Sequence, residues 1–456
     1  MKTLSNDDLT IKNARRVHLV GVGGSGMCPI AELLLLKGYE ISGSDRAKSD
    51  NTNRLEMLGA KIFIGQKAEN ISGADIVCYS AAVHSDNPEL VAAREAGIPT
   101  FERSQLLGAI TRFYDNTVGV AGTHGKTTVS SMITQILLLN KQNPSAVIGG
   151  KLPIAGSACV CGEGDTLVCE SCEFVDSFLE FSPDISVLLN IDDDHLDYFK
   201  TMDNLVTSFK KFCGKSKICY YNGDDPLCKK AIDGICSEKI SCGFGEDNFY
   251  RPENIEAGKF GFCFDVVRGG ETVGHLDMHV PGRHNIYNGL VSFAVCFEAG
   301  VSAAGINSAL EKFTGAGRRF QFIGEKRGVT VVDDYAHHPT EIAATLSAAK
   351  SLGFKKVITV FQPYTYSRVA LLKDGMIKSL SIADKVFLTP IVASREENVY
   401  GVSSEDIAAG LPDGRVISDY GLLAAEMAAA ANDGDVIITM GAGDIFKVAD
   451  TVLEKL

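Results

Sequence analysis

A phosphate-loop pattern between a strand and a helix constrains this sequence more than any other feature. The β-rich run 117–121 leads into Gly122-Thr123-His124-Gly125-Lys126-Thr127-Thr128, and an apolar helix is predicted over 129–139. In such a loop the backbone N–H groups hold phosphate oxygens, the lysine reaches the β- and γ-phosphates, and the threonine hydroxyl can ligate Mg²⁺. The glycine spacing departs from the usual pattern, because Gly119 lies one residue too far upstream. A buried lysine without an anion is costly, so we predict a nucleotide site.

Short apolar runs alternate with helical patterns along the chain, which predicts an α/β fold with parallel sheets. Before the phosphate loop, strands are predicted at 17–20, 39–42 and 76–80, and a helix at 29–37. After it, strands are predicted at 166–170, 185–190, 329–332, 357–361, 385–388 and 436–439. Shorter strands and turns are expected between 215 and 280, and helices within 281–300 and 422–431. We predict three α/β domains in series, comprising residues 1–107, 108–314 and 315–456.

Composition excludes several classes of protein. The 456-residue chain has a formal net charge of −13, so no nucleic-acid partner is expected, because phosphate contacts need a basic face. No apolar run reaches the ~18 residues that span a membrane, and residues 1–10 lack a signal-peptide pattern. Thirteen irregularly spaced cysteines are typical of free, mostly buried thiols in a reducing compartment. We therefore expect a cytoplasmic protein without a membrane partner, and the oligomeric state stays open.

A second glycine-rich loop lies near the N-terminus, at Gly21-Val22-Gly23-Gly24-Ser25-Gly26-Met27. Glycines let a backbone approach a pyrophosphate, whose charge is met by helix N-terminal N–H groups. Asp45 lies about twenty residues further on, where an acid that binds a ribose is found in dinucleotide-binding folds. The G-x-G-G-x-G spacing is unusual, and a tight turn without a ligand is the alternative interpretation.

Acidic residues follow two predicted strands of the middle region. Glu170-Ser171-Cys172-Glu173 follows one strand, and Asn190-Ile191-Asp192-Asp193-Asp194-His195 follows another. Because α/β sheets bind ligands at the carboxyl ends of their strands, either glutamate can serve a Mg²⁺ ion, and His195 a second ion. For Asp192 and Asp193 a solvated turn or a helix N-cap is the better interpretation.

Further polar groups occur at the later predicted strand and helix ends. Asn285 and Asn288 are three residues apart, which suits an adenine edge if the segment is helical, although helix capping explains Asn285 equally well. An arginine of Arg318-Arg319 can stabilise a transferring phosphate, or form a solvated basic turn. Other candidates follow two strands of the last region: Asp334, His337, His338 and Arg368. Arg368 can hold a carboxylate by a two-pronged contact, and one of the histidines a substrate.

Taken together, the motifs resemble those of the Mur ligase family of peptidoglycan synthesis. The resemblance covers nearly the whole chain, in the order GVGGSGM, GTHGKTT, ESCE, NIDDDHLD, PGRHN, GRRF, DDYAHHPTE and FQPYTYSR. It implies a three-domain architecture, with an N-terminal Rossmann-like domain that binds a UDP-sugar, a central P-loop-type ATPase domain and a C-terminal Rossmann-like domain that binds an amino acid. It also implies ATP-dependent joining of L-alanine to the lactyl carboxylate of UDP-N-acetylmuramate, with Mg²⁺ as cofactor.

The resemblance also assigns residues to each substrate. The UDP-sugar site would contain Gly23, Gly24, Ser25, Gly26, Met27, Asp45, Ser80 and Asn87. ATP would contact the loop 122–128, Asn285, Asn288, Arg319 and Asp334, and magnesium would be held by Thr127, Glu173 and His195. His337, His338 and Arg368 would face the amino acid. The groups nearest the reacting atoms would be Lys126, Glu173, His195, Arg319, His338 and Arg368.

Two segments depart from the family pattern. Relatives tend to have histidine and sometimes arginine where this chain has Tyr364 and Thr365, next to the predicted carboxylate site. Where relatives read E-x-D-E-S-D-x-S-F, this chain has Cys172, Phe174 and Val175 in place of polar residues. Counting back from Ser177-Phe178 favours Glu173 as the magnesium ligand, with Glu170 in reserve.

Other functions remain as alternatives. A recycling ligase that joins a peptide to the same sugar shares much of the pattern. A nicotinamide-dependent dehydrogenase would explain the N-terminal loop and Asp45, but would leave the phosphate loop and the acidic motifs without a purpose. A nucleotide-binding switch would bind ATP without ligase chemistry. Alanine, glycine and serine differ by groups worth only ~1–3 kcal/mol, so the preference among them stays open.

Overall fold

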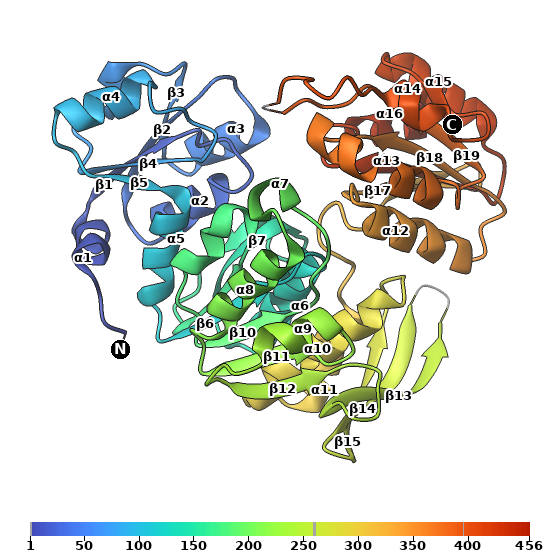
Figure 1. The fold of residues 1–456 in the computed structure, drawn as a ribbon, viewed down its shortest axis with the longest axis horizontal. Coiled ribbons are helices and arrows are strands. Elements are labelled where there is room, and N and C mark those ends of the chain that lie inside the picture. Colours follow the sequence, from blue (N-terminus) through green and yellow to red (C-terminus); the bar gives the residue numbers. More distant parts are fainter. Residues whose placement is uncertain (1, 259–260, 395) are drawn as a thin grey trace. The chain divides into compact units, whose positions relative to one another are not determined.

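The computed structural model describes residues 2–258, 261–394 and 396–456 (Figure 1). Within these residues three β-sheets are present, each flanked by helices, which confirms the predicted α/β class. Residues 1–252, 266–274 and 290–309 form one compact unit, and residues 253–265, 275–289 and 310–456 form a second. The domain limits at 107 and 314 stay predictions.

The N-terminal sheet has five parallel strands in the order β3-β2-β1-β4-β5 (Figure 1, blue). The strands are β1 (Arg16–Val20), β2 (Glu40–Asp45), β3 (Lys61–Ile64), β4 (Ile76–Tyr79) and β5 (Thr100–Glu102). The helices are α1 (Asn6–Asn13), α2 (Cys28–Leu36), α3 (Asp50–Met57), η1 (Ala68–Ile71), α4 (Pro88–Glu95) and α5 (Arg103–Arg112). Strand order reverses between β1 and β4, and parallel sheets bind ligands at such a reversal. The glycine loop 21–27 follows β1 at this point.

The central sheet has the strand order β15-β14-β13-β12-β11-β10-β6-β9-β7-β8. Its strands are β6 (Asn116–Ala121), β7 (Ser145–Leu152), β8 (Ser157–Val160), β9 (Thr166–Glu170), β10 (Ile185–Leu188), β11 (Ile218–Asn222), β12 (Glu238–Cys242), β13 (Tyr250–Ala257), β14 (Phe262–Arg268) and β15 (Glu271–Met278). The helices are α6 (Lys126–Leu139), η2 (Phe174–Glu180), α7 (Leu196–Phe199), α8 (Met202–Cys213), α9 (Pro226–Ile232), α10 (His284–Glu298) and α11 (Ala303–Glu311). Strand β6 is parallel to both of its neighbours, β10 and β9. The segments that follow these three strands therefore meet at one edge of the sheet.

The C-terminal sheet has the order β16-β17-β21-β18-β19-β20 (Figure 1, orange to red). Its strands are β16 (Gln321–Lys326), β17 (Val329–Asp334), β18 (Val357–Gln362), β19 (Lys385–Leu388), β20 (Arg415–Val416) and β21 (Val436–Gly441). The helices are α12 (Pro339–Ser351), α13 (Tyr366–Leu380), α14 (Ser404–Ala408), α15 (Tyr420–Ala430) and α16 (Lys447–Lys455). Among the described strands of this sheet, β16 alone pairs antiparallel, with β17. Strands β18 and β21 are buried along their whole length, as expected for parallel strands covered on both faces.

Polar contacts fasten the N-terminal sheet to the central one within the first compact unit. Lys2 pairs with Asp184, which precedes β10, at 2.9 Å. The Glu32 carboxylate on α2 is 4% exposed and accepts a hydrogen bond from Ser157 of β8 at 2.8 Å. Glu32 also forms an ion pair with Arg54 of α3 at 2.7 Å. A carboxylate on a helix beside the N-terminal sheet is therefore satisfied partly by a strand of the central sheet.

The predicted strands are present, with ends that shift by a few residues. The 166–170 and 385–388 predictions match β9 and β19, whereas β10 ends at Leu188 rather than at residue 190. The sequence patterns did not reveal β3, β5 or the β7–β8 hairpin, which are short or irregular. All thirteen cysteines are free, and most are buried. Among the described residues, no helix combines the length and the apolar character needed to cross a membrane.

Candidate functional site

Two glycines allow the phosphate loop to turn between β6 and α6. Gly122 has a φ of 135°, and a Cβ atom there would lie 3.0 Å from Leu189 and 3.1 Å from the backbone of Asn190. Gly125 has a φ of 85° and caps the N-terminus of α6. A side chain at either position would strain the backbone, and at Gly122 it would also meet the neighbouring segment. The loop thus brings Lys126 to the first turn of α6.

The partly buried Lys126 forms an ion pair with the buried Glu173. Its Nζ lies 2.9 Å from Oε2 of Glu173, whose side chain is 2% exposed. The same ammonium donates hydrogen bonds to the carbonyls of Gly122 at 2.5 Å and Thr123 at 3.0 Å. Burial alone lowers the pKa of Lys126, but the negative charges around it, that of Glu173 foremost, together with the hydrogen bond to Glu173 outweigh burial, and the pKa is raised. The ammonium is therefore held in place and fully charged.

Thr127 and Glu170 form a second polar pair beside the first. The Thr127 hydroxyl donates to Oε2 of Glu170 at 2.9 Å, and the same oxygen accepts from the backbone N–H of Gly149 at 2.7 Å. Both glutamates lie at the end of a strand, as the sequence pattern predicted, and the structure brings both to the phosphate loop. Glu173 contacts the loop lysine, whereas Glu170 contacts the loop threonine.

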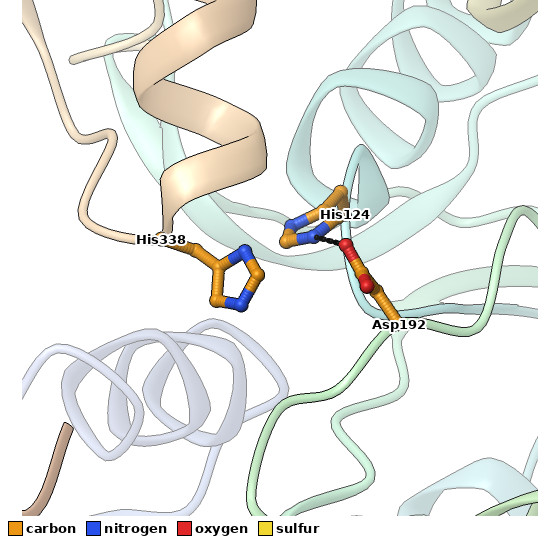
Figure 2. A group of neighbouring side chains, drawn as sticks. All are labelled: His124, Asp192 and His338. Atoms are coloured by element: carbon orange, nitrogen blue, oxygen red, sulfur yellow. Dashed lines mark hydrogen bonds and ion pairs between the residues drawn. The ribbon is translucent and has the colours of Figure 1, made fainter. Parts of the chain in front are cut away.

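The segment after β10 holds the phosphate loop from the other side. Asn190 accepts from the N–H of His124 at 2.8 Å and donates to the carbonyl of His124 at 3.0 Å. Figure 2 shows the ring of His124 beside the carboxylate of Asp192, with Nε2 and Oδ2 3.1 Å apart. The N–H of Asp192 donates to Thr123 at 2.9 Å. Asp192 is therefore an orienting partner of the loop rather than the solvated turn or helix cap that was the preferred sequence interpretation.

His195 lies next to the glutamate segment. Its ring packs on Phe174, the residue after Glu173, with ring centroids 4.7 Å apart. It has a left-handed backbone, with a φ of 57°, and caps α7. Its Nε2 lies 3.6 Å from the carboxylate of Asp194. The motifs after β9 and β10 therefore meet, as expected for the carboxyl ends of strands in one parallel part of the sheet.

The N-terminal glycine loop is held by residues of β2 and α3. Asp45 accepts a hydrogen bond from the N–H of Gly23 at 2.8 Å, and Asn51 donates to the carbonyl of Gly23 at 2.8 Å. Ser80 approaches from β4, since its Oγ lies 3.2 Å from the place a Cβ on Gly21 would occupy. One oxygen of Asp45 thus organises the loop itself, a role that its distance from the loop in the sequence did not reveal.

Asn87, which the family resemblance places near the UDP-sugar, is the N-cap of α4. It is 8% exposed, accepts from the N–H of Glu89 at 2.9 Å and donates to Gln66 at 2.7 Å. Glu89 is itself buried and accepts from Ser44 at 2.6 Å and Asn70 at 2.6 Å. Asn87 therefore belongs to a mostly buried polar network with Glu89, Ser44 and Asn70.

The two neighbouring arginines of the GRRF motif differ in their surroundings. Arg318 pairs with buried Asp333 at 2.9 Å and donates to the carbonyls of Gly441 at 2.6 Å and Gly443 at 3.0 Å. Its contacts are therefore those of a structural residue. Arg319 has only a long ion pair of 3.8 Å with Glu341 and lies over the ring of Tyr335 at 5.2 Å. Among the described residues, the 3.8 Å pair with Glu341 is the only ion pair of the Arg319 guanidinium.

The segment after β17 is tightly hydrogen-bonded. Asp334 accepts from the N–H groups of Phe320 and Ala336, both at 2.7 Å. Burial raises the pKa of Asp334 to about 6, against the opposing charge of Arg319. His338 is 2% exposed and is the N-cap of α12. His337 contacts the carbonyl of Tyr335 at 3.0 Å, so the adjacent histidines have different partners, as expected for an extended segment.

The first turn of α13 contains Arg368, and an acidic residue from another segment, Glu396, binds to this turn. Glu396 accepts from the N–H of Ser367 at 2.8 Å and from its hydroxyl at 2.5 Å. Thr365 precedes the helix with a φ of 63°, which is strained for a β-branched residue. Tyr364 donates to Ser394 at 3.0 Å. No sequence pattern pointed to Glu396, because it lies about thirty residues from its partner.

Asn285 and Asn288 lie on one face of α10, as their spacing predicted. Asn288 donates to the side-chain oxygen of Asn285 at 2.8 Å, and Asn285 donates to the carbonyl of Pro281 at 2.6 Å. Both side chains are almost fully buried. Asn285 is the second residue of the helix rather than the residue before it, so it is not the N-cap.

A phosphate loop with a charged, partly buried lysine, two glutamates and an orienting histidine–aspartate pair, set in a chain whose described residues form three α/β sheets, defines a nucleotide-dependent enzyme. Three family models cover most of the sequence: "Mur ligase family, catalytic domain" over residues 16–115, "Mur ligase middle domain" over 120–296 and "Mur ligase, glutamate ligase domain" over 318–443. The chain belongs to the Mur ligase family.

Similar proteins share the full length of the chain. It is 40% identical to a UDP-N-acetylmuramate–L-alanine ligase of Caldicellulosiruptor bescii, over 96% of this chain and 98% of that one. It is 41% identical to the ligase of the same name from Acetivibrio thermocellus, over 96% of each. The crystal structure of the UDP-N-acetylmuramate–alanine ligase MurC of Thermotoga maritima matches with a TM-score of 0.83 and 27% identity, over 96% of this chain and 98% of that one. A murein peptide ligase of Psychrobacter arcticus shares the fold, with a TM-score of 0.74 and 22% identity, over 97% of this chain and 98% of that one.

Proposed function

We propose that this protein joins L-alanine to the lactyl carboxylate of UDP-N-acetylmuramate at the expense of ATP, in the synthesis of peptidoglycan precursors. The observation that carries the proposal is the buried Lys126–Glu173 pair at the phosphate loop, in a chain similar over its full length to ligases of this name. The cytoplasm supplies all three substrates and is the compartment this function requires.

In this proposal ATP binds to the loop 122–128. The backbone N–H groups at the start of α6 would hold phosphate oxygens, and Lys126 would leave Glu173 to contact the β- and γ-phosphates. The pairs of Asn190 with His124 and of Asp192 with His124 keep the loop in shape before the nucleotide arrives. Asn285 and Asn288 are assigned to the adenine, and Asp334 to the ribose.

The oxygen donors around the loop fit a magnesium ion. A hydroxyl and two carboxylates gather there, from Thr127, Glu170 and Glu173, and such hard oxygen donors are what Mg²⁺ prefers. We assign Thr127 and Glu173 as ligands, with Glu170 as the reserve, and His195 to a second ion. When bound, the metal supplies positive charge that reduces repulsion between the phosphates and an attacking carboxylate.

The reaction follows from the weakness of a carboxylate as an acylating agent. A lactyl carboxylate oxygen attacks the γ-phosphorus of ATP, the bond to the β-phosphate oxygen breaks, and ADP leaves. The amine of L-alanine then attacks the carbonyl carbon of the acyl phosphate. The tetrahedral intermediate collapses with loss of phosphate and of a proton from nitrogen, which leaves the amide. Lys126 and Arg319 hold charge on the transferring phosphoryl group throughout.

The C-terminal sheet is assigned to the amino acid. Arg368 would hold the carboxylate by paired hydrogen bonds, and His337 and His338 would face the amine and the methyl group. Tyr364 and Thr365 replace the basic residues of many relatives, and in this chain they contact the 392–394 segment. The carboxylate site is therefore built from Arg368 and the first turn of α13.

The test is phosphate release from Mg-ATP in the presence of UDP-N-acetylmuramate, with L-alanine, glycine, L-serine or a short peptide added separately. Release that requires both the sugar nucleotide and L-alanine is expected. Release with the peptide alone would move the assignment to a peptide-joining ligase. Absence of release in every combination, with ATP still bound, would reject ligase chemistry.

A further inference from the structure

An arginine that has no role in the proposed reaction lies beside the N-terminal glycine loop. Arg103 is the first residue of α5 and directly follows β5. A Cβ atom built on Gly26 would lie 3.4 Å from Nη1 of Arg103 and 3.5 Å from its Cζ. The guanidinium therefore lies against Gly26, just before the start of α2.

Arg103 is partly buried, yet its side chain forms no hydrogen bond or ion pair with any residue that the structure describes. Other arginines of the same compact unit are paired: Arg54 with Glu32 at 2.7 Å and Arg112 with Asp8 at 2.6 Å. A guanidinium withdrawn from water without an anion is costly. An anion from outside the described residues would therefore stabilise the guanidinium of Arg103.

The charge of Arg103 acts at the carboxyl ends of strands in two sheets. Burial raises the pKa of the Cys78 thiol on β4 and of the Cys169 thiol on β9, and the positive charge of Arg103 opposes the shift in both cases. Glu102 adds negative charge near Cys78 but forms no ion pair with Arg103. The strand order of the N-terminal sheet reverses beside β4, where ligands of such sheets bind.

We propose that Arg103 binds the diphosphate of the UDP-sugar above Gly26. The inference rests on the proposed function, which assigns the loop 23–27 to that substrate. A guanidinium presents a planar fork of N–H donors that matches two phosphate oxygens, which a point charge does not. Gly26 lets the guanidinium lie directly against the loop, so that one diphosphate could contact both, because a Cβ atom at this position would already lie 3.4 Å from Nη1 of Arg103.

The experiment is calorimetric titration of the full chain without ATP, using UDP-N-acetylmuramate, UDP, uridine and N-acetylmuramic acid as separate ligands. The variants are Arg103→Gln, Arg103→Lys and, as a matched control, Arg15→Gln, whose parent residue is exposed and paired with Glu40. Arg103→Gln is expected to weaken the binding of UDP and of UDP-N-acetylmuramate by the same factor, about 10- to 100-fold, because both ligands lose charge-assisted hydrogen bonds. Arg103→Lys is expected to recover part of the loss, and uridine binding to stay unchanged.

The other outcomes separate the inference from the function on which it rests. Loss confined to UDP-N-acetylmuramate and N-acetylmuramic acid would assign Arg103 to the lactyl carboxylate and overturn the diphosphate assignment. Equal loss for every ligand, uridine included, would mean a structural role and also overturn it. Unchanged affinities in Arg103→Gln would refute it with the proposed function intact, whereas failure of the unsubstituted protein to bind UDP-N-acetylmuramate would refute the proposed function itself.

Discussion

Neutralising Glu173 should tighten the binding of metal-free ATP, although it should impair the reaction. In the nucleotide-free protein the Lys126 ammonium lies 2.9 Å from the Glu173 carboxylate, so it must leave that carboxylate to reach a phosphate. A hydrogen bond to a charged group contributes ~1.5–3 kcal/mol. Removing this competitor with Glu173→Gln should therefore lower the Kd of ATP in EDTA by about 10- to 150-fold.

The assay is equilibrium titration of a fluorescent ATP analogue in EDTA, followed by displacement with ATP. Glu170→Gln is the matched control, because Glu170 contacts Thr127 rather than Lys126. Neutralising either glutamate also reduces the repulsion of the ATP phosphates, so the gain in ATP affinity caused by Glu173→Gln must be measured both with and without Lys126. In a Lys126→Ala background the gain should shrink to that of Glu170→Gln.

Two results would refute this reasoning. If Glu173→Gln bound metal-free ATP no more tightly than the unsubstituted protein, the ion pair would not compete with the nucleotide. If the gain were the same with and without Lys126, it would come from general repulsion alone. With magnesium present, Glu173→Gln should lose most ligase activity, and an unchanged magnesium titration there, with a changed one in Glu170→Gln, would transfer the ligand role to Glu170.

Three further predictions concern the C-terminal sheet. Burial raises the pKa of Asp334 to about 6, so the folded state binds this proton more tightly than the unfolded state, and the carboxyl makes stability fall as pH rises from about 4 to 6. The melting temperature of Asp334→Asn, measured relative to the unsubstituted protein, should therefore rise across that pH window. A difference in melting temperature that does not depend on pH would contradict the raised pKa. Glu396→Gln should raise the KM for L-alanine several-fold and leave the KM for ATP unchanged, because the first turn of α13 loses a charged partner. The control is Glu397→Gln at the exposed neighbouring residue, which should change neither constant. Thr365→Gly should raise the free energy of unfolding by up to about 1 kcal/mol, since a φ of 63° suits glycine better than threonine, and a loss of stability in thermal unfolding would show that the threonine side chain contributes more than its strain costs.

The parts of the site that depend on strand ends were predictable from the sequence. Glu173 and His195 each follow an apolar run, and parallel strands bring such residues to one edge of a sheet, so the contact of Glu173 with Lys126 and the packing of His195 on the glutamate segment could be expected. The spacing of Asn285 and Asn288 likewise placed them on one helix face. These relations depend on periodicity and strand direction, which a sequence expresses directly.

The parts that depend on exact partners were not predictable. Asp192 looked like a turn residue, because its contact with His124 requires knowing which loops adjoin. The local pattern did not distinguish Arg318 from Arg319, and only the family resemblance favoured Arg319, because the contacts of Arg318 with Asp333 and two glycine carbonyls come from distant parts of the chain. Such assignments follow from three-dimensional neighbours rather than from local pattern.

The contacts of Lys2 and Glu32 have a consequence for how the molecule loses its structure. Lys2 is anchored to Asp184, and the buried carboxylate of Glu32 is partly satisfied by Ser157, so separating the first two sheets would leave charged groups without their partners. Unpaired buried charge is expensive enough to couple neighbouring elements into one cooperative unit. We therefore expect amide hydrogens of β1 and β6 to exchange through a common opening event. A shortened chain that ends before the central sheet would expose this seam and be less stable than the same residues in the whole protein.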